Sequence, residues 1–187
     1  MADTPPYPTG TVTFLFTDIE GSTRLWRDEP ELMRAELAEH DMLIREAIEK
    51  RRGFVFKHTG DGVCAAFSSP KSAVDAAVAA QRALKLPVRM GLATGEAELR
   101  DGDYFGTVLK RAARVMAAGH GGQILVADST AVLLSDVDLL DLGPRRLRDV
   151  SAPVGVFQVR APGLRTEFPS LRTLDPTAGN LRPVMTS

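Results

Sequence analysis

Residues 14–23 read FLFTDIEGST, and this segment is more informative than any other in the sequence. The run Thr11–Thr17 is rich in β-branched and aromatic side chains, a composition that predicts a buried strand. The strand runs into Asp18, and a short polar turn then opens a helix. Such a turn presents unpaired backbone N–H groups and the positive end of the helix dipole. We therefore expect the turn to cradle phosphate oxygens through Glu20, Gly21, Ser22 and Thr23.

A second carboxylate lies in residues 57–62, KHTGDG. Strand-like runs flank this glycine-rich turn, Phe54–Lys57 before it and Val63–Phe67 after it, so the pattern predicts a hairpin with Asp61 at its tip. Taken alone, Asp18 could be a helix cap and Asp61 a turn residue. Together, two acids at two strand ends suggest a two-metal site.

The remaining chain alternates between helical and strand-like patterns. Helices are expected over 24–52, where Gly53 ends the pattern, from Pro70, with Ser69 as its cap, until Pro87 closes it, and over 108–118. Strands are expected over 88–94 and 123–127, a loop over 102–106, and smaller elements over 129–159. The leading order β-α-β-β-α-β predicts an α+β, ferredoxin-like fold (split βαβ, palm-type), an antiparallel sheet with its helices on one face. In this topology Asp18 and Asp61 meet at one edge of the sheet.

Three parts of the chain differ in composition. Residues 1–10 form a lead-in containing Pro and Gly, residues 11–160 one globular domain, and residues 161–187 a tail containing Pro and Arg. The tail fits neither a helix nor a packed strand, and we expect extended turns or disorder. The alternative is an arm that docks an arginine on the domain, for example at the site carboxylates, and lowers activity.

The formal net charge of −1 gives no general attraction to nucleic acid or to an anionic membrane. No signal peptide and no long apolar stretch is evident, so we expect a cytoplasmic protein. The single cysteine, Cys64, falls in an apolar strand and is interpreted as a buried free thiol. Among the histidines, only His58 is expected near the site.

Mg²⁺ prefers oxygen ligands and is often held by one or two carboxylates together with substrate phosphates, as Asp18 and Asp61 would allow. A basic cluster adds to this site. Lys110 and Arg114 share a helical face, and their mutual repulsion would be reversed by an anionic partner, although a solvated basic face explains them equally well. A further basic group near Arg148 is interpreted, on its own, as solvated surface.

The ordered set of motifs resembles the class III nucleotidyl cyclases, the adenylate and guanylate cyclase homology domain. The resemblance covers roughly residues 10–159. It rests on residues 16–23, on Lys57 four positions before Asp61, and on the segments 91–96, 103–114 and 119–123.

The resemblance implies that ATP is converted to 3′,5′-cyclic AMP and pyrophosphate, with two Mg²⁺ or Mn²⁺ ions per site. Asp18 and Asp61 then match the metal ligands, with the Ile19 carbonyl as a further ligand. Lys57 and Asp103 match the purine-reading positions, Arg114 the arginine that stabilises charge on the α-phosphate, and Arg148 a basic residue for the outer phosphates.

Family members work as head-to-tail dimers with composite sites, so the resemblance implies a homodimer. The two metal-binding aspartates would come from one protomer. The partner would supply Lys57, Asp103, Lys110, Arg114 and Arg148.

One position departs from the family pattern. Lys110 stands where the family usually has an asparagine that orients the ribose, and an ammonium group cannot replace the amide. We therefore expect low to moderate activity, and a catalytically weak or inactive nucleotide-binding module remains the alternative. A diguanylate cyclase is disfavoured because the sequence has no Gly-Gly-Asp/Glu-Glu-Phe run.

Overall fold

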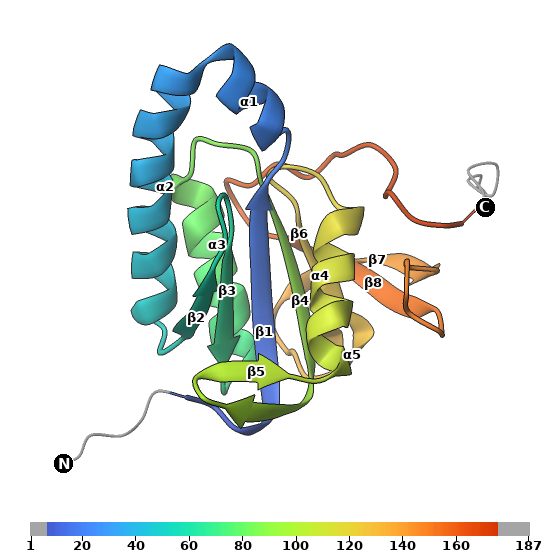
Figure 1. The fold of residues 1–187 in the computed structure, drawn as a ribbon. Helices are drawn as coiled ribbons and strands as arrows, with labels where there is room; N and C mark the ends of the chain where they lie inside the picture. The colour runs from blue at the N-terminus through green and yellow to red at the C-terminus, as the bar shows by residue number, and fades with distance from the viewer. Residues whose placement is uncertain (1–6, 176–187) are drawn as a thin grey trace.

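The computed structural model describes residues 7–175 (Figure 1). Five helices and eight strands are found in this part of the chain. In order they are β1 (Gly10–Ile19), α1 (Ser22–Asp28), α2 (Pro30–Glu49), β2 (Phe54–His58), β3 (Val63–Phe67), α3 (Pro70–Ala83), β4 (Val88–Arg100), β5 (Asp103–Phe105), α4 (Thr107–Ala118), β6 (Ile124–Ala127), α5 (Asp128–Ala131), β7 (Asp138–Arg145) and β8 (Val154–Arg160).

The strands form one mixed sheet in the order β2-β3-β1-β4-β6-β8-β7, and β5 pairs with β4 outside this path. β1 is antiparallel to both of its neighbours, β3 and β4, whereas β4 and β6 are parallel. The predicted palm-type α+β fold is confirmed. Its topology brings the end of β1 and the β2–β3 turn to the same edge.

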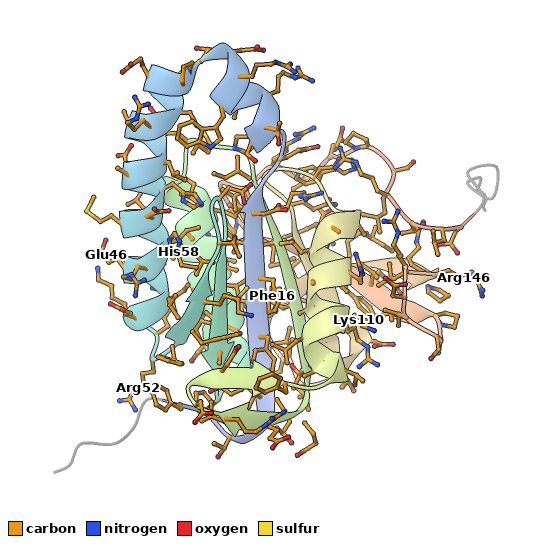
Figure 2. The ribbon with its side chains drawn as sticks, in the orientation of Figure 1. Phe16, Glu46, Arg52, His58, Lys110 and Arg146 are labelled. Carbon is orange, nitrogen blue, oxygen red and sulfur yellow. The ribbon has the colours of Figure 1, made fainter. Side chains whose placement is uncertain are left out.

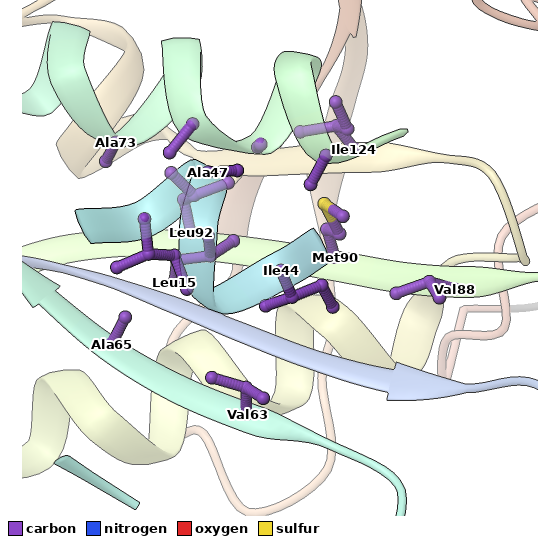
Figure 3. Packing of buried hydrophobic residues seen from close by; sticks show 14 of the residues in the cluster. Leu15, Ile44, Ala47, Val63, Ala65, Ala73, Val88, Met90, Leu92 and Ile124 are labelled. Carbon is purple, nitrogen blue, oxygen red and sulfur yellow. The ribbon is translucent and has the colours of Figure 1, made fainter. Parts of the chain in front are cut away.

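The two helices of the leading β-α-β-β-α-β order, α2 and α3, pack on one face of this sheet. Leu15 of β1, Ile44 and Ile48 of α2, and Ala73 and Ala77 of α3 share one buried cluster (Figure 3). Successive strand side chains point to opposite faces, so Phe14 joins a second cluster with Val108, Ala112 and Val115 of α4. Helix α4 therefore lies on the opposite face, in front of the sheet in Figure 1.

Three element boundaries differ from the sequence prediction. The single helix expected over 24–52 is broken at Glu29, because Pro30 begins a new helix and favours an extended residue before it. Strand β4 extends beyond Thr94 to Arg100, and the loop expected over 102–106 contains the short strand β5. These paired strands close the lower end of the sheet in Figure 1.

Other local predictions are confirmed. The hairpin of β2 and β3 forms as expected, and the backbone N–H of Ser72 donates to the Ser69 side chain at 3.1 Å, which caps α3. The C-terminal elements 128–160 supply β7 and β8, and β8 pairs with β6. Within residues 7–175, no helix combines the length and apolarity needed to cross a membrane.

Residues 161–175 lie against the domain instead of extending from it. Leu164 packs on the first apolar cluster and Leu171 on the second. In Figure 1 this segment passes the end of α4. Of the two expectations for this part of the tail, the structure shows turns and extended chain, which apolar side chains anchor to the domain. Pro176 and Pro183 lie outside the described residues.

Candidate functional site

The two acidic residues meet at one edge of the sheet. The β1–β3 pairing ends at Thr17 opposite Val63, so Asp18 and Asp61 lie just beyond the same last pair. A Cβ at Gly62 would lie 2.2 Å from the Thr17 carbonyl oxygen, so only glycine lets the hairpin turn approach β1 this closely. The prediction that Asp18 and Asp61 stand at the same edge of the sheet is confirmed.

Asp61 is also tied to the turn after β1. The Ser22 hydroxyl donates to Asp61 Oδ2 at 2.7 Å. This hydrogen bond joins the hairpin tip to the first residue of α1. The turn that carries Asp18 and the turn that carries Asp61 are therefore one connected unit.

Arg89 is a site residue that the sequence interpretation missed. It stands opposite Asp18 in the β1–β4 register, and its Nε and Nη2 donate to the two Asp18 oxygens at 2.7 and 2.5 Å. The hydrogen bond to Asp18 raises the pKa of Arg89 above its usual value. The signal in the sequence was an arginine at the start of the strand 88–94, but only the strand register shows that it meets Asp18.

The donor set at this edge fits a hard divalent cation. Within residues 7–175, no group of three or more His, Cys, Asp or Glu side chains could hold a metal. Two carboxylates suffice for Mg²⁺, which keeps several waters and takes phosphate oxygens from its substrate. A carboxylate offers about four lone-pair positions, of which Arg89 occupies two on Asp18, so metal ligation remains compatible with the ion pair. The Ile19 carbonyl stays a prediction as a ligand.

The turn after β1 has fewer free backbone donors for phosphate than expected. The Glu20 N–H donates to the Pro87 carbonyl at 2.8 Å, so this donor is already used. Gly21 adopts φ 72° and begins α1 without a side-chain cap. Of the predicted cradle, the N–H groups of Gly21, Ser22 and Thr23 therefore remain the candidates, while the Glu20 carboxylate points to the turn after α4 and accepts from Gly121 N–H.

Lys57 and Asp103, the two predicted purine-reading residues, come together within one chain. A register shift between Val55 and Lys57 sets Lys57 opposite Cys64, and Lys57 Nζ lies 3.8 Å from Asp103 Oδ2. Their side chains are 52 % and 39 % exposed, so both remain accessible to a ligand. The contact is too long for a hydrogen bond, so the Lys57 ammonium keeps donors and the Asp103 carboxylate keeps acceptor positions for a ligand.

Cys64 lies beneath this pair. Burial raises the pKa of its thiol to about 11, with smaller opposing effects from Lys57 and Asp103. The thiol is buried and free, as predicted. It therefore stays protonated at neutral pH, on the strand position opposite Lys57.

The third cluster lies on α4. Val108, Ala112 and Val115 are buried, so Lys110 and Arg114 lie on the outer side of the helix, where Figure 2 labels Lys110. Arg114 Nη2 donates to Asp149 at 2.9 Å, and its Nε is buried without a partner among the described residues. Asp149 therefore orients the Arg114 guanidinium, while one of its N–H donors has no hydrogen-bond partner among the described residues.

Arg148 is exposed and lies near Arg114. Both residues line a pocket of about 310 Å³, together with Arg172 of the C-terminal segment. The structure therefore groups two predicted phosphate-binding arginines with a third one that was not predicted. Only His58 was expected near the site, but His120 also lies there: its Nδ1 is 3.8 Å from Glu20 Oε2, in the turn after β1.

The sequence and the structure were compared with known proteins. Residues 4–93 match the family model described as the adenylate and guanylate cyclase catalytic domain. The structure of adenylate cyclases from Trypanosoma brucei in their monomeric state superposes with a TM-score of 0.82 at 29 % identity, covering 91 % of this chain and 98 % of that one. Residues 4–93 therefore carry the sequence pattern of the adenylate and guanylate cyclase catalytic domain, and the fold of residues 7–175 is that of a cyclase domain.

Other relatives extend the comparison of this cyclase domain. An uncharacterised protein of Mycobacterium tuberculosis is 38 % identical over 94 % of the chain, which spans 65 % of that relative's length. A receptor-type adenylate cyclase of Trypanosoma brucei brucei is 31 % identical over 90 % of the chain and 18 % of its own length. An adenylate/guanylate cyclase/hydrolase of Silicibacter pomeroyi superposes with a TM-score of 0.72 at 27 % identity, covering 81 % of this chain and 97 % of that one.

Proposed function

We propose that this cyclase domain converts ATP to 3′,5′-cyclic AMP and pyrophosphate. The ribose 3′-oxygen forms a new bond to the α-phosphorus, the bond between the α-phosphorus and the bridging oxygen breaks, and pyrophosphate leaves with that oxygen. The 3′-hydroxyl proton passes to solvent. Asp18 and Asp61 would hold two Mg²⁺ or Mn²⁺ ions, which supply activation of the hydroxyl and neutralisation of phosphate charge when bound.

The observation that carries the choice of ATP is the contact between Lys57 and Asp103. Adenine presents an acceptor at ring N1 and a donor at its 6-amino group. A lysine can only donate and a carboxylate only accepts, so this pair matches adenine at both positions. Guanine presents a donor at N1 and an acceptor at O6, and would meet the wrong partner twice.

The basic residues have complementary roles in this proposal. Arg114 stabilises the charge that develops on the α-phosphate, and Arg148 binds the outer phosphates. Arg89 neutralises Asp18 in the free protein and can also offer its guanidinium to a triphosphate held at this edge. The free N–H groups from Gly21 to Thr23 bind phosphate oxygens.

We further propose that the active form is a head-to-tail homodimer, on the resemblance to the family. The Lys57–Asp103 contact supports one part of that arrangement, because a single protomer supplies both purine-reading residues to one site. In this arrangement Asp18 and Asp61 of the same protomer serve the other site.

An assay of product with ATP and with GTP, in Mg²⁺ and in Mn²⁺, tests the proposal. We expect cyclic AMP from ATP and little cyclic GMP. Asp18→Ala and Asp61→Ala should abolish product, whereas Asp75→Ala, an aspartate on α3 that pairs with Lys71, should not change it. Equal rates with ATP and GTP would refute the purine argument, and activity retained in both aspartate variants would refute the metal site.

Lys110 favours a second candidate function, that of a nucleotide sensor. If the ribose is poorly oriented, the domain would bind ATP without turning it over and would act as a nucleotide sensor. Calorimetric binding of ATP without cyclic product, lost in Lys57→Met, would favour this alternative. Binding and product together would exclude it.

A further inference from the structure

The segment after β8 is held on the domain by a series of backbone contacts at the end of α4. The Arg172 N–H donates to the Ala118 carbonyl and the Leu174 N–H to the Arg146 carbonyl, both at 2.9 Å. His120 Nε2 lies 2.9 Å from the Ser170 carbonyl oxygen. Together with the burial of Leu171, these contacts fix the segment in one register on the domain.

This register places the Arg172 guanidinium between two parts of the site. Its Nη1 donates at 3.2 Å to the carbonyl of Gly119, the residue that caps the C-terminus of α4, where a cation is favourable. Its Nη2 donates to Glu20 Oε2. Arg172 therefore connects the turn after β1 with the end of the helix that carries Arg114.

Glu20 is held at three points. Its N–H donates to Pro87, its Oε1 accepts from the Gly121 N–H at 2.6 Å, and its Oε2 accepts from Arg172. The Gly121 hydrogen bond and the Arg172 contact lower the pKa of Glu20, so the carboxylate is ionised at neutral pH. Glu20 follows Ile19 directly and stands two residues after Asp18. Contacts that hold Glu20 in place therefore also hold the end of β1, where the metal ligands are proposed.

We propose that Arg172 is a positioning residue, which holds Glu20 and so sets the Asp18–Ser22 turn relative to α4. The proposal rests on the proposed function for the importance of that turn. It also differs from simple blockade, because Arg172 contacts Glu20, while Asp18 is paired with Arg89 and Asp61 with Ser22. The segment leaves the two carboxylates open and supports the turn that carries them.

Arg172 also lies beside the arginines that are proposed to bind phosphate. Arg172 lines one pocket with Arg114 and Arg148. In a head-to-tail dimer, the metal turn and these arginines of one protomer serve different sites.

The experiment compares Arg172→Ala, Arg172→Lys and Glu20→Gln with Arg165→Ala as the matched control. Arg165 belongs to the same segment, but its guanidinium stacks on the Phe168 ring and its Nε donates to the Glu167 carbonyl, within the segment itself. Hydrogen exchange of the metal-free protein is measured first, at residues 18–23 and 119–122. We expect faster exchange at both places in Arg172→Ala, partial recovery in Arg172→Lys, and no change in Arg165→Ala.

Mn²⁺ affinity and cyclase kinetics are then measured on the same proteins. Loss of a residue that orients a metal ligand costs about 10-fold to 100-fold in affinity or activity, so we expect Arg172→Ala to weaken Mn²⁺ binding by about 10-fold and to lower kcat more than it changes KM for ATP. The double variant of Glu20→Gln and Arg172→Ala should be no worse than the stronger single variant, because both act through one contact.

The outcomes separate this proposal from the proposed function. Unchanged exchange and Mn²⁺ binding in Arg172→Ala would overturn the positioning role, even if the wild-type protein makes cyclic AMP. An increased rate would overturn it in favour of an inhibitory arm. A wild-type protein without cyclase activity would refute the proposed function, but the exchange and Mn²⁺ measurements would still decide the role of Arg172.

Discussion

Gly91 of β4 allows α4 to lie directly on the sheet, and adding one methyl group there tests how tightly the helix is placed. A Cβ at position 91 would lie 2.3 Å from the backbone nitrogen of Met116 and 2.6 Å from its Cα. Non-bonded heavy atoms pack at about 3.5–4.0 Å, so α4 must move away by roughly 1 Å to accept Gly91→Ala. The obstacle is helix backbone, which cannot rotate aside.

The expected cost follows from this geometry. Overpacking a core typically costs about 1–3 kcal/mol, and replacing glycine in a strand returns about 0.5–1 kcal/mol of chain entropy. Because the clash is with helix backbone, the upper end of the overpacking range applies, and we expect Gly91→Ala to lower the free energy of unfolding by about 2 kcal/mol net. With a urea m-value of about 2 kcal/mol/M, the midpoint falls by about 1 M. Because α4 carries Lys110 and Arg114, product formation should fall even where the variant is fully folded.

Gly95→Ala is the matched control, because it lies on the same face of β4. There a Cβ would meet the Val108 side chain at 3.2–3.3 Å, and that side chain can adjust. We expect a change within about 0.5 kcal/mol. Urea titrations followed by circular dichroism measure both variants. The packing argument fails if Gly91→Ala is as stable as the wild type, or if Gly95→Ala is the less stable of the two.

Three further outcomes are expected. Lys110→Asn should raise turnover with ATP in a steady-state assay, since the amide can orient the ribose; an unchanged or lower rate would count against that role. The raised pKa of Cys64, about 11, keeps the native thiol neutral while the unfolded chain ionises first, so stability should fall as pH rises from about 9 to 11. Urea melts of Cys64→Ala should show a smaller fall, because Tyr104, whose pKa burial raises to about 12, still contributes a fall above about pH 10. Ser69→Ala removes the cap of α3 and should cost about 1 kcal/mol, measured as a lower urea midpoint; no loss would contradict the observed cap.

Much of the site was predictable because it depends on element order. The strand before Asp18, the hairpin around Asp61 and the stripe of Val108 and Ala112 on α4 are read from local patterns. Once the order β-α-β-β-α-β is known, topology alone brings the two acids to one edge. The break at Pro30 was also readable from local chemistry but was missed, because the helical pattern continues on both sides of it.

Other features depended on register, which local patterns do not specify. The Asp18–Arg89 ion pair needs the β1–β4 register, and the approach of Lys57 to Asp103 needs the shift in the β2–β3 pairing. A shift of one residue would turn either side chain to the other face of the sheet. Sequence reasoning could name Lys57 and Asp103 only through the family resemblance.

Local sequence patterns specify the order of strands and helices, and with it the edge of the sheet where Asp18 and Asp61 stand. The cations that pair with the acidic residues there were visible only in the folded chain. Arg89 reaches Asp18 across a strand pair, and Arg172 reaches Glu20 from a segment that follows the last strand. The reason is physical: backbone propensity and hydrophobic period act over a few residues, whereas an ion pair forms wherever the packed chain brings opposite charges into contact.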